Sequence, residues 1–582
     1  MRVVRVLILI LLATFLSARA ERFDIVIVGG TPGGIMTAIE AARMGKRVVI
    51  LERTNHIGGL PANGLGATDI ATRGATTGLF SEFTNAVKQH YIDTYGADSQ
   101  QVKDCSDGFH FEPSVAAKVF ADMISAVSDS LIEVRTMRQF NFTNDDIDLS
   151  DNGSRINAIR VINRKTGNSE QYEGSIFVDA TYEGDLGAAA RVPYRIGREA
   201  AWEFNEPGAG RTYEYWKSDP AEGSTGDADN AVQAYNYRLC LTNDTTQLIP
   251  FPKPENYNRD EYVSLIEDVW TGRHTWRAMR DITPEQMEAN RQHLLNGGER
   301  SITPWDSWGL AKIVSYNTIP NGKTDANNQH SAFISTDLPE ENWPWPTSSW
   351  EWRDRFAKRL RDYTLGLLWF AANDEELPVQ FRNEVAKWGL SSTEYEDNDF
   401  FPRQVYVREG RRFEGMYFFT AADALPVSED GRPPVHSNSI TASHYALDSH
   451  AARKREEGRA HLDGFISYPT AVYTVPYGVI VPKKVENLLL PVPVSGSHIG
   501  FSTLRMEPCW MALGQAAGAA ASLAIDENIS VQDVPINALQ NRLLEEKATL
   551  IYFKDLSPDD PDFAKIQLHA LQENNPGWTV NE

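Results

Sequence analysis

A glycine-rich turn between an apolar strand and a helix constrains this chain more than any other feature. The apolar segment 23–28 predicts a strand, the turn Gly29-Gly30-Thr31-Pro32-Gly33-Gly34 follows, and residues 35–44 predict a helix. A second apolar strand, 47–51, ends in Glu52. In such a βαβ unit the turn lets the backbone approach a pyrophosphate, the helix N-terminus faces the negative charge, and an acid about 20 residues further on accepts from a ribose. The sequence therefore predicts a dinucleotide-binding domain.

The turn departs from the G-x-G-x-x-G pattern at its middle position. Gly29 and Gly34 fill the outer positions, but Thr31 stands in the middle. Thr31 places a Cβ where close approach to phosphate is wanted, although its hydroxyl can itself donate to phosphate. Glycines that only permit tight packing are the alternative interpretation. The surrounding strands, helix and acid favour nucleotide binding.

The first 20 residues predict a secretory signal peptide. Arg2 and Arg5 precede the apolar run 6–16, and Ala18-Arg19-Ala20 provides an A-x-A cleavage signal. The apolar run is short for a bilayer span, so we expect secretion without stable membrane insertion, with a retained anchor as the alternative. Four N-x-S/T sequons support secretion and predict glycosylation at Asn141, Asn152, Asn243 and Asn528.

Composition narrows the class of protein further. The net charge of −23 makes nucleic acid an improbable partner, and 582 residues with 42% hydrophobic content predict two or three lobes around a sizeable core. Cys105, Cys240 and Cys509 allow at most one disulfide bond, and no C-x-x-C pair supports a dithiol reductase. No histidine, cysteine or carboxylate cluster has metal-ligand spacing, so no metal is expected. No G-x-S-x-G hydrolase motif is present.

Apolar patterning returns late in the chain. Helices are predicted at 111–131 and 511–521, and strands at 132–135, 155–164, 175–180 and 487–493. We expect a nucleotide-binding domain split by an insertion, with these parts: signal peptide 1–20, first part of the domain 21–200, a polar and irregular substrate lobe 201–470, a return segment 471–526, and a helical tail 527–582. Trp343, Trp345, Trp350 and Trp352 lie in the insertion, where inter-lobe packing is favoured over stacking on a cyclic substrate.

Several segments resemble a known family. The Gly58-Gly59 pair after Glu52 is similar to glutathione-reductase-type FAD proteins. The segments 111–113, 179–186, 233–240, 406–412 and 495–508 resemble landmarks of the FAD-dependent oxidoreductases often labelled xanthan lyases, in a secreted, fungal-type form. Ser114 and Gly496 depart from the histidine and alanine common there. The resemblance implies an α/β fold: a split Rossmann-like FAD-binding domain with a parallel sheet and an inserted α+β substrate lobe.

The resemblance also implies where FAD binds. At the pyrophosphate we expect Gly29, Gly30, Thr31, Gly33 and Gly34, and at the adenosine ribose Glu52 and Arg53. Near the phosphates and the ribityl chain we expect Gly58 and Gly59, and at the adenine the backbone of Val134. At the carboxyl edge of the sheet we expect Ala180 and Thr181, and at the flavin ring the backbone amides of Ser495 to Ser502.

Dehydrogenation of an alcohol needs a base for the hydroxyl proton while hydride leaves carbon. His498 is the first candidate because it lies in the segment expected to meet the flavin, and His450, two residues after Asp448, is the second. Tyr477 follows as a further base, and Arg408 and Arg505 are candidates for holding substrate, with ion pairs to Glu409 and Glu507 as the structural alternative.

The predicted function is thus a secreted FAD-dependent dehydrogenase or oxidase. It transfers hydride to flavin from a small organic substrate, which is an alcohol, a sugar or a secondary-metabolite intermediate, and passes electrons to molecular oxygen or another acceptor. A flavin-dependent monooxygenase using NAD(P)H and a flavin-binding protein without turnover are the alternatives.

Overall fold

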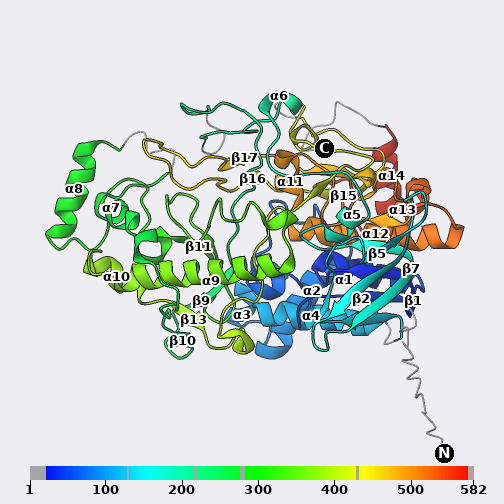
Figure 1. The fold of residues 1–582 in the computed structure, drawn as a ribbon, viewed down its shortest axis with the longest axis horizontal. Coiled ribbons are helices and arrows are strands. Elements are labelled where there is room, and N and C mark those ends of the chain that lie inside the picture. The colour runs from blue at the N-terminus through cyan, green and yellow to red at the C-terminus, as the bar shows by residue number, and fades with distance from the viewer. Residues whose placement is uncertain (1–20, 128–129, 215–218, 276–281, 428–430, 574–582) are drawn as a thin grey trace, which may run out of the picture.

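The computed structural model describes residues 21–573 apart from 128–129, 215–218, 276–281 and 428–430 (Figure 1). The predicted signal peptide at 1–20 lies outside these residues. Two regions lie side by side: a mainly parallel sheet with its helices on the right of Figure 1, and a second sheet with long helices on the left.

The first sheet contains the predicted βαβ unit. Its strand order is β3-β2-β1-β7-β6-β4, with β5 joined to β6 and β19 joined to β7. The strands are β1 (Glu21–Val28), β2 (Val48–Leu51), β3 (Ile132–Arg135), β4 (Arg138–Gln139), β5 (Ile147–Leu149), β6 (Ile156–Asn163), β7 (Ser169–Asp179) and β19 (Leu488–Leu489). The pairs β3-β2, β2-β1, β1-β7 and β7-β19 are parallel, whereas β6 lies antiparallel to β7, β5 and β4. The α/β fold with a parallel sheet is therefore confirmed.

The late helix packs directly on the first one. Helix α1 (Pro32–Arg43) lies against α12 (Glu507–Glu527), and Thr37 Oγ1 bonds the carbonyl of Gly514 at 2.9 Å. A Cβ at Gly514 would overlap the backbone of Gly33. The small residues of α12 thus allow two helices far apart in sequence to approach at backbone distance, and β19 returns to the same sheet.

The insertion is more regular than the sequence indicated. It contains an antiparallel sheet of order β10-β13-β9-β12-β11, formed by β9 (Leu239–Thr242), β10 (Leu248–Ile249), β11 (Val314–Ile319), β12 (Lys323–Asn328) and β13 (Gly389–Ser391). The expectation of an irregular lobe was wrong because β12 reads Lys-Thr-Asp-Ala-Asn-Asn and shows no apolar alternation. Its buried charges are paired instead: Lys323 with Glu112 and Glu394, and Asp325 with Arg238.

The remaining elements cover these two sheets or connect them. They are α2 (Leu79–Tyr95), α3 (Gln100–Asp104), α4 (Pro113–Val127), α5 (Asp185–Ala189), β8 (Tyr194–Arg195), α6 (Ala201–Phe204), α7 (Ser264–Thr271), α8 (Pro284–Leu295), α9 (Trp350–Asn373), α10 (Val379–Val385), β14 (Arg412–Phe413), β15 (Ser439–Ser443), β16 (Leu447–Ser449), β17 (Ile466–Tyr468), β18 (Tyr473–Pro476), α11 (His498–Leu504), α13 (Ile536–Glu545) and α14 (Phe563–Glu573).

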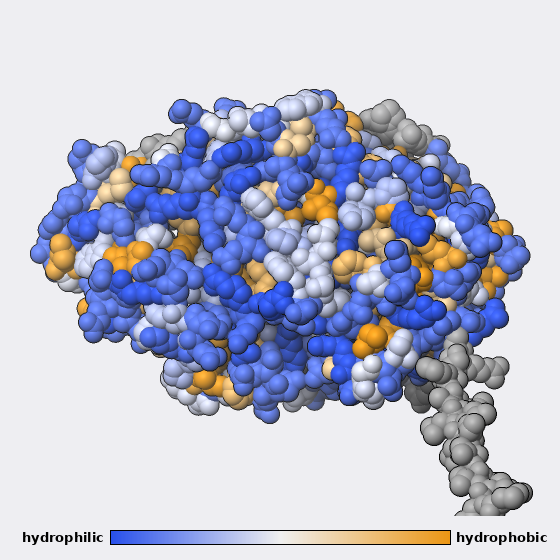
Figure 2. All heavy atoms as spheres, viewed as in Figure 1, coloured by the Kyte–Doolittle hydropathy of each residue, from blue (hydrophilic) through white to orange (hydrophobic). Residues whose placement is uncertain are grey.

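The surface is dominated by hydrophilic residues on the face drawn in Figure 2, with apolar residues in small separate patches. Across the described part of the chain, no helix combines the length and the apolarity needed to cross a membrane. All three cysteines are buried free thiols. Of the sequon asparagines, Asn152, Asn243 and Asn528 are exposed and Asn141 is half-buried.

Candidate active site

The glycine turn after β1 requires glycine at both outer positions of its motif. Gly29 has φ +107°, and a Cβ there would lie 2.7 Å from the Ala180 carbonyl oxygen. A Cβ at Gly34 would overlap the carbonyl oxygen of Gly29. The turn therefore brings the N-terminus of α1 close to the ends of β1 and β7, at the carboxyl edge of the parallel strands where ligands of such sheets bind.

Thr31 caps α1. Its hydroxyl accepts from the Gly34 amide at 3.3 Å and donates to the Ala180 carbonyl oxygen at 2.7 Å. The predicted donation from this hydroxyl to phosphate is not available in this arrangement, because its proton is already used. Thr31 instead fixes the direction of the helix N-terminus.

Glu52 stands at the end of β2 and is held by the chain around it. Its Oε2 accepts from the Gly30 amide at 2.8 Å, and its Oε1 accepts from both the amide and the hydroxyl of Thr54 at 2.7 Å. These bonds leave further lone pairs for ribose hydroxyls. Arg53, next in sequence, donates to Asp354 at 2.6 Å and lies over the ring of Trp350 at 4.1 Å.

These residues line one cavity, which we call the nucleotide cavity. Its walls include Gly29, Thr31, Glu52, Arg53 and Thr181 from the sheet region, and Trp345, Trp350, Val405 and Val407 from the insertion. Trp345 donates to Glu183 and Trp350 donates to the Phe140 carbonyl oxygen. Trp345 and Trp350 therefore pack between the two regions and also line this cavity, whereas Trp343 and Trp352 contact Ala452 and Phe356 inside the insertion.

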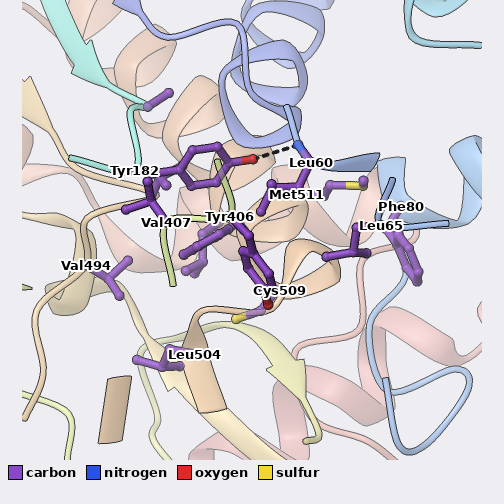
Figure 3. Close-up of a cluster of buried hydrophobic side chains, with 14 of the residues drawn as sticks. Leu60, Leu65, Phe80, Tyr182, Tyr406, Val407, Val494, Leu504, Cys509 and Met511 are labelled. Carbon is purple, nitrogen blue, oxygen red and sulfur yellow. Dashed lines mark hydrogen bonds between the residues drawn. The ribbon is translucent and has the colours of Figure 1, made fainter. Parts of the chain in front are cut away.

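The Gly58-Gly59 pair places a backbone segment beside a buried tyrosine. Gly58 and Gly59 have φ +102° and +50°, and a Cβ at Gly59 would overlap the Tyr182 hydroxyl. That hydroxyl accepts from the Leu60 amide at 3.1 Å and donates to Glu507 Oε1 at 2.6 Å. Figure 3 shows the bond from Tyr182 to Leu60 within a cluster that also contains Tyr406, Val407 and Val494.

Glu507 is a functional candidate that sequence reasoning treated only as a partner for Arg505. It begins α12, is 2% exposed, and its Oε2 makes no hydrogen bond within the described part of the chain. Burial raises the pKa of Glu507 to about 8. Its position before a proline, at the start of the small-residue helix, is the sequence signal that could have identified it.

The expected FAD fits the residues present. Glu52 offers acceptors for a ribose, and the N-terminus of α1 would favour a phosphate beside it. The buried Glu507 Oε2 has no hydrogen bond within the described residues and could receive one from a polar group near the Tyr182 hydroxyl. Glu507 can supply either an acceptor or, when protonated, a donor.

Other predicted cofactor residues lie away from the nucleotide cavity. Val134 pairs with Ile50 in the edge strand β3, and Gly33 packs under Val492 and Trp510. The Ser495 amide donates to Val479 and the Ser497 amide to Phe419, while Ser502 Oγ donates to Ile499. The amides of His498 and Gly500 donate to Glu199 and to Ser497 Oγ. These amides therefore donate to acceptors within the protein itself.

A second cavity, of about 230 Å³, lies on the other side of the segment 404–407. Gln404, Val405 and Val407 line the nucleotide cavity, whereas Tyr406 lines this one. We call it the polar cavity because every lining residue except Phe465 carries a hydrogen-bonding side chain: Asp69, Arg238, Ser315, Asn317, Asp325, Asn327, Asn328, His330, Tyr406, Tyr445, Asp448, His450 and Ser467.

His450 is the predicted base that reaches the polar cavity. Its Nδ1 lies 2.9 Å from Asp337 Oδ2, and its Nε2 lies 3.6 Å from Asp448 Oδ2. Arg505 donates to the Tyr406 hydroxyl at 2.8 Å and to Asp448 at 2.9 Å. Arg408 pairs with Asp337 at 2.9 Å. The arginines thus pair with Asp337 and Asp448, and the alternative pairing with Glu409 and Glu507 was wrong.

His498 and Tyr477 lie in the interior and line neither cavity. His498 is 2% exposed, with Nδ1 2.8 Å from Glu409 and Nε2 3.0 Å from Ser449 Oγ. Burial raises the pKa of Glu409, but His498 and Arg412 outweigh it and hold that pKa at about 2. The Tyr477 hydroxyl donates to the Val531 carbonyl oxygen. Both side chains are fully engaged by the protein.

Solved structures match parts of the chain at low similarity. The anhydrotetracycline hydroxylase OxyS from Streptomyces rimosus is 12% identical over 31% of this chain and 36% of its own, with a TM-score of 0.22. A 3-ketosteroid-Δ4-(5α)-dehydrogenase from Rhodococcus jostii RHA1 is 16% identical over 32% and 52%, with a TM-score of 0.20. A glycerol-3-phosphate dehydrogenase from Bacillus halodurans, complexed with FAD, is 8% identical over 30% and 37%, with a TM-score of 0.21. The chain spans about a third to half of the length of these proteins.

No curated protein sequence matches this chain. A family model does, and it extends over nearly all of the chain: the model described as FAD dependent oxidoreductase matches residues 24–543, from the first strand through the split sheet to α13. The match covers the glycine turn, Glu52, both cavities and α12. The chain therefore belongs to the FAD dependent oxidoreductase family.

Proposed function

We propose that the protein dehydrogenates an alcohol carbon of a small organic substrate bound in the polar cavity. The observation that carries this proposal is the shared wall between the two cavities. Along the segment 404–407, Val405 and Val407 line the nucleotide cavity and Tyr406 lines the polar cavity. A substrate in the polar cavity thus lies one chain segment away from the nucleotide cavity. Hydride transfer needs direct contact, so in this proposal the hydride-accepting part of bound FAD would have to reach past this segment, beside Tyr182 and Leu60 (Figure 3).

His450 acts as the base in this proposal. When Nδ1–H donates to Asp337, the lone pair is on Nε2, which faces Asp448 across 3.6 Å at the wall of the polar cavity. Nε2 takes the hydroxyl proton as hydride leaves the same carbon. Asp448 then faces the imidazolium that forms, and Asp337 holds the ring in one tautomer, as the carboxylate does in other His–Asp pairs.

Arg505 and Arg408 position this pair. Burial raises the pKa of Asp337, but Arg408 and His450 outweigh it and keep that pKa below its usual range. Asp448 is likewise held below its usual pKa range by His450 and Arg505 against the effect of burial. Both carboxylates therefore stay ionised beside the imidazole at neutral pH, which favours proton transfer to it.

FAD is held by Glu52, the N-terminus of α1 and the Gly58-Gly59 segment in this proposal. Bound FAD supplies the hydride acceptor. Tyr182 and Glu507 would help to hold the cofactor through the Glu507 oxygen that has no hydrogen bond within the described residues, and the apolar side chains around them would exclude water. The electrons pass on to molecular oxygen or another acceptor.

Anaerobic flavin reduction tests this function. Holoenzyme is mixed with a panel of alcohols, sugars and polyols, with and without NADPH, and the flavin absorbance is followed. Bleaching by an alcohol alone is the expected result. Bleaching that requires NADPH supports the monooxygenase alternative, and no bleaching under either condition supports a binding protein without turnover.

The chain is also proposed to be secreted. The leader at 1–20 and the exposed sequon residues Asn152, Asn243 and Asn528 support this location. Free NAD(P)H is scarce outside cells, which favours a dehydrogenase or oxidase over a monooxygenase.

A further inference from the structure

Asp69 stands out in the polar cavity because it has no hydrogen-bond donor. Its nearest cation is Arg238, whose Nη1 is 3.7 Å from Asp69 Oδ2, and none of the described residues donates a hydrogen bond to it. Arg238 is instead committed to Asp325, to which its Nε donates at 2.7 Å. The Asp69 side chain is only 20% exposed. A largely buried carboxylate without donors is expected to receive them from a ligand.

Apart from Asp69, the charges around the cavity are mixed and paired. Arg238 pairs with Asp325, Arg505 with Asp448, and Arg408, just behind the wall, with Asp337. All three guanidinium groups also lie over the ring of Tyr406, at 5.6, 6.0 and 4.6 Å. The guanidinium groups would repel a cationic ligand, and the carboxylates would repel an anionic ligand. A neutral ligand avoids both repulsions and the cost of burying a further charge.

Neutral hydrogen-bonding groups fill the rest of the lining. Asn317 lies on β11 without a side-chain bond to the described residues, and Asn327 Oδ1 accepts from Asn236 and Arg408, which turns its amide protons to other partners. Tyr445 lies so close to Asp69 that this charge raises the pKa of its hydroxyl well above the usual range. Phe465 stacks on His330 with centroids 6.0 Å apart and adds an apolar ring to the lining.

From this arrangement we infer that the polar cavity binds a neutral, hydroxyl-rich ring such as a sugar or cyclic polyol, with Asp69 accepting from vicinal hydroxyls. Carboxylate and amide groups satisfy several hydroxyls at once, and the Phe465 ring supplies an apolar contact for C–H groups. The inference rests on the proposed function, because it identifies the substrate class of the same cavity.

The first experiment compares rings that differ in charge. Binding to oxidised holoenzyme is measured by calorimetry with a range of neutral methyl hexosides, methyl pentosides and inositols, with glucuronate, with glucosamine, and with cyclohexanol. At least one neutral hydroxylated ring is expected to bind about tenfold or more tightly than the charged rings and cyclohexanol. Preference for a charged ring or for cyclohexanol overturns the inference. It is also overturned if no neutral ring binds when the ring is in 100-fold molar excess over the protein.

The second experiment uses variants of the lining. Asp69→Asn keeps the size of the side chain but removes its charge, so binding of the neutral ring should weaken about 10- to 100-fold. Asn317→Leu, at an exposed strand position, should also weaken binding without disturbing the fold. Asp122→Asn, on the exposed face of α4, is the matched control and should bind normally. Unchanged affinity in both cavity variants overturns the inference.

The same data separate this inference from the proposed function. A neutral ring that binds but does not bleach the flavin leaves the substrate class intact and contradicts alcohol dehydrogenation. Bleaching by an alcohol that carries no further hydroxyls, without binding of any polyol, supports the dehydrogenase and contradicts the substrate class.

Discussion

His450 Nδ1 lies 2.9 Å from Asp337 Oδ2, and Asp337 accepts from Arg408 at the same distance through its other oxygen. All three side chains are buried, yet the imidazole lines the polar cavity. His498, by contrast, lines neither cavity, and its two ring nitrogens contact Glu409 and Ser449. The two histidines that the sequence placed first and second as bases thus differ in access to substrate.

Replacing the two histidines separates chemistry from structure. His450→Gln should retain the flavin spectrum but lose flavin reduction by substrate by a factor on the order of 10²–10⁴, the usual contribution of a positioned base. His498→Gln should reduce flavin at near-normal rates once folded. It should lose about 1–3 kcal/mol of unfolding free energy because buried Glu409 loses a hydrogen-bond partner.

Stopped-flow reduction and urea unfolding of both variants make the comparison. A catalytic defect confined to His498→Gln, with normal rates in His450→Gln, would show that the base assignment is reversed.

Gly34→Val should abolish flavin binding or folding. Its Cβ would overlap the Gly29 carbonyl oxygen, so the turn cannot keep its shape. The purified variant is expected to be colourless or aggregated, as judged by absorbance near 450 nm and by thermal unfolding. Ala121→Val, on the exposed face of α4, serves as the control for an added branched side chain. Full flavin occupancy in Gly34→Val would contradict the assigned role of the turn.

Glu507 makes the stability of the cofactor-free protein depend on pH. Its pKa is raised to about 8 in the folded state, whereas the reference value is 4.5. Between these values the folded state holds a proton that the unfolded state has released, so unfolding free energy falls as pH rises. The loss contributed by this residue is on the order of 4 kcal/mol between pH 4.5 and 8.

Glu507→Gln should remove much of this decline because its side chain does not titrate. Urea unfolding of both apo-proteins at pH 5, 6, 7 and 8 measures how the unfolding free energy of each protein changes with pH. Parallel stability curves for the two proteins would mean that Glu507 is already ionised in the folded state.

Secretion predicts a processed and glycosylated chain. In a eukaryotic host, the mature protein should begin near Glu21 and lose mass on treatment with an N-glycosidase. Asn152→Gln, Asn243→Gln and Asn528→Gln should each remove one glycan, because these residues are exposed, and Asn141→Gln should change the mass least because Asn141 is half-buried. An intact Met1 in a cytosolic fraction would disprove the signal-peptide interpretation.

Local order in the sequence predicted which residues of the glycine turn and the second strand lie together. The run from β1 through the turn to Glu52 is contiguous, so spacing alone places Gly29, Thr31 and Glu52 at one cavity. The role of Thr31 could not be predicted in the same way, because its partner, the Ala180 carbonyl, is about 150 residues away in sequence.

The sequence by itself determined the α/β class with its parallel sheet and the glycine turn of a dinucleotide-binding domain, because each depends on periodicity or on a short contiguous motif. FAD as cofactor came from the resemblance of several segments to FAD-dependent oxidoreductases. Only the tertiary structure decided which polar residues share a cavity. Asp69, Asn317, Tyr406 and His450 come from four separate segments, and their meeting depends on how the insertion packs against the sheet. It also decided that His498 is enclosed, since burial depends on neighbours that residue spacing does not specify.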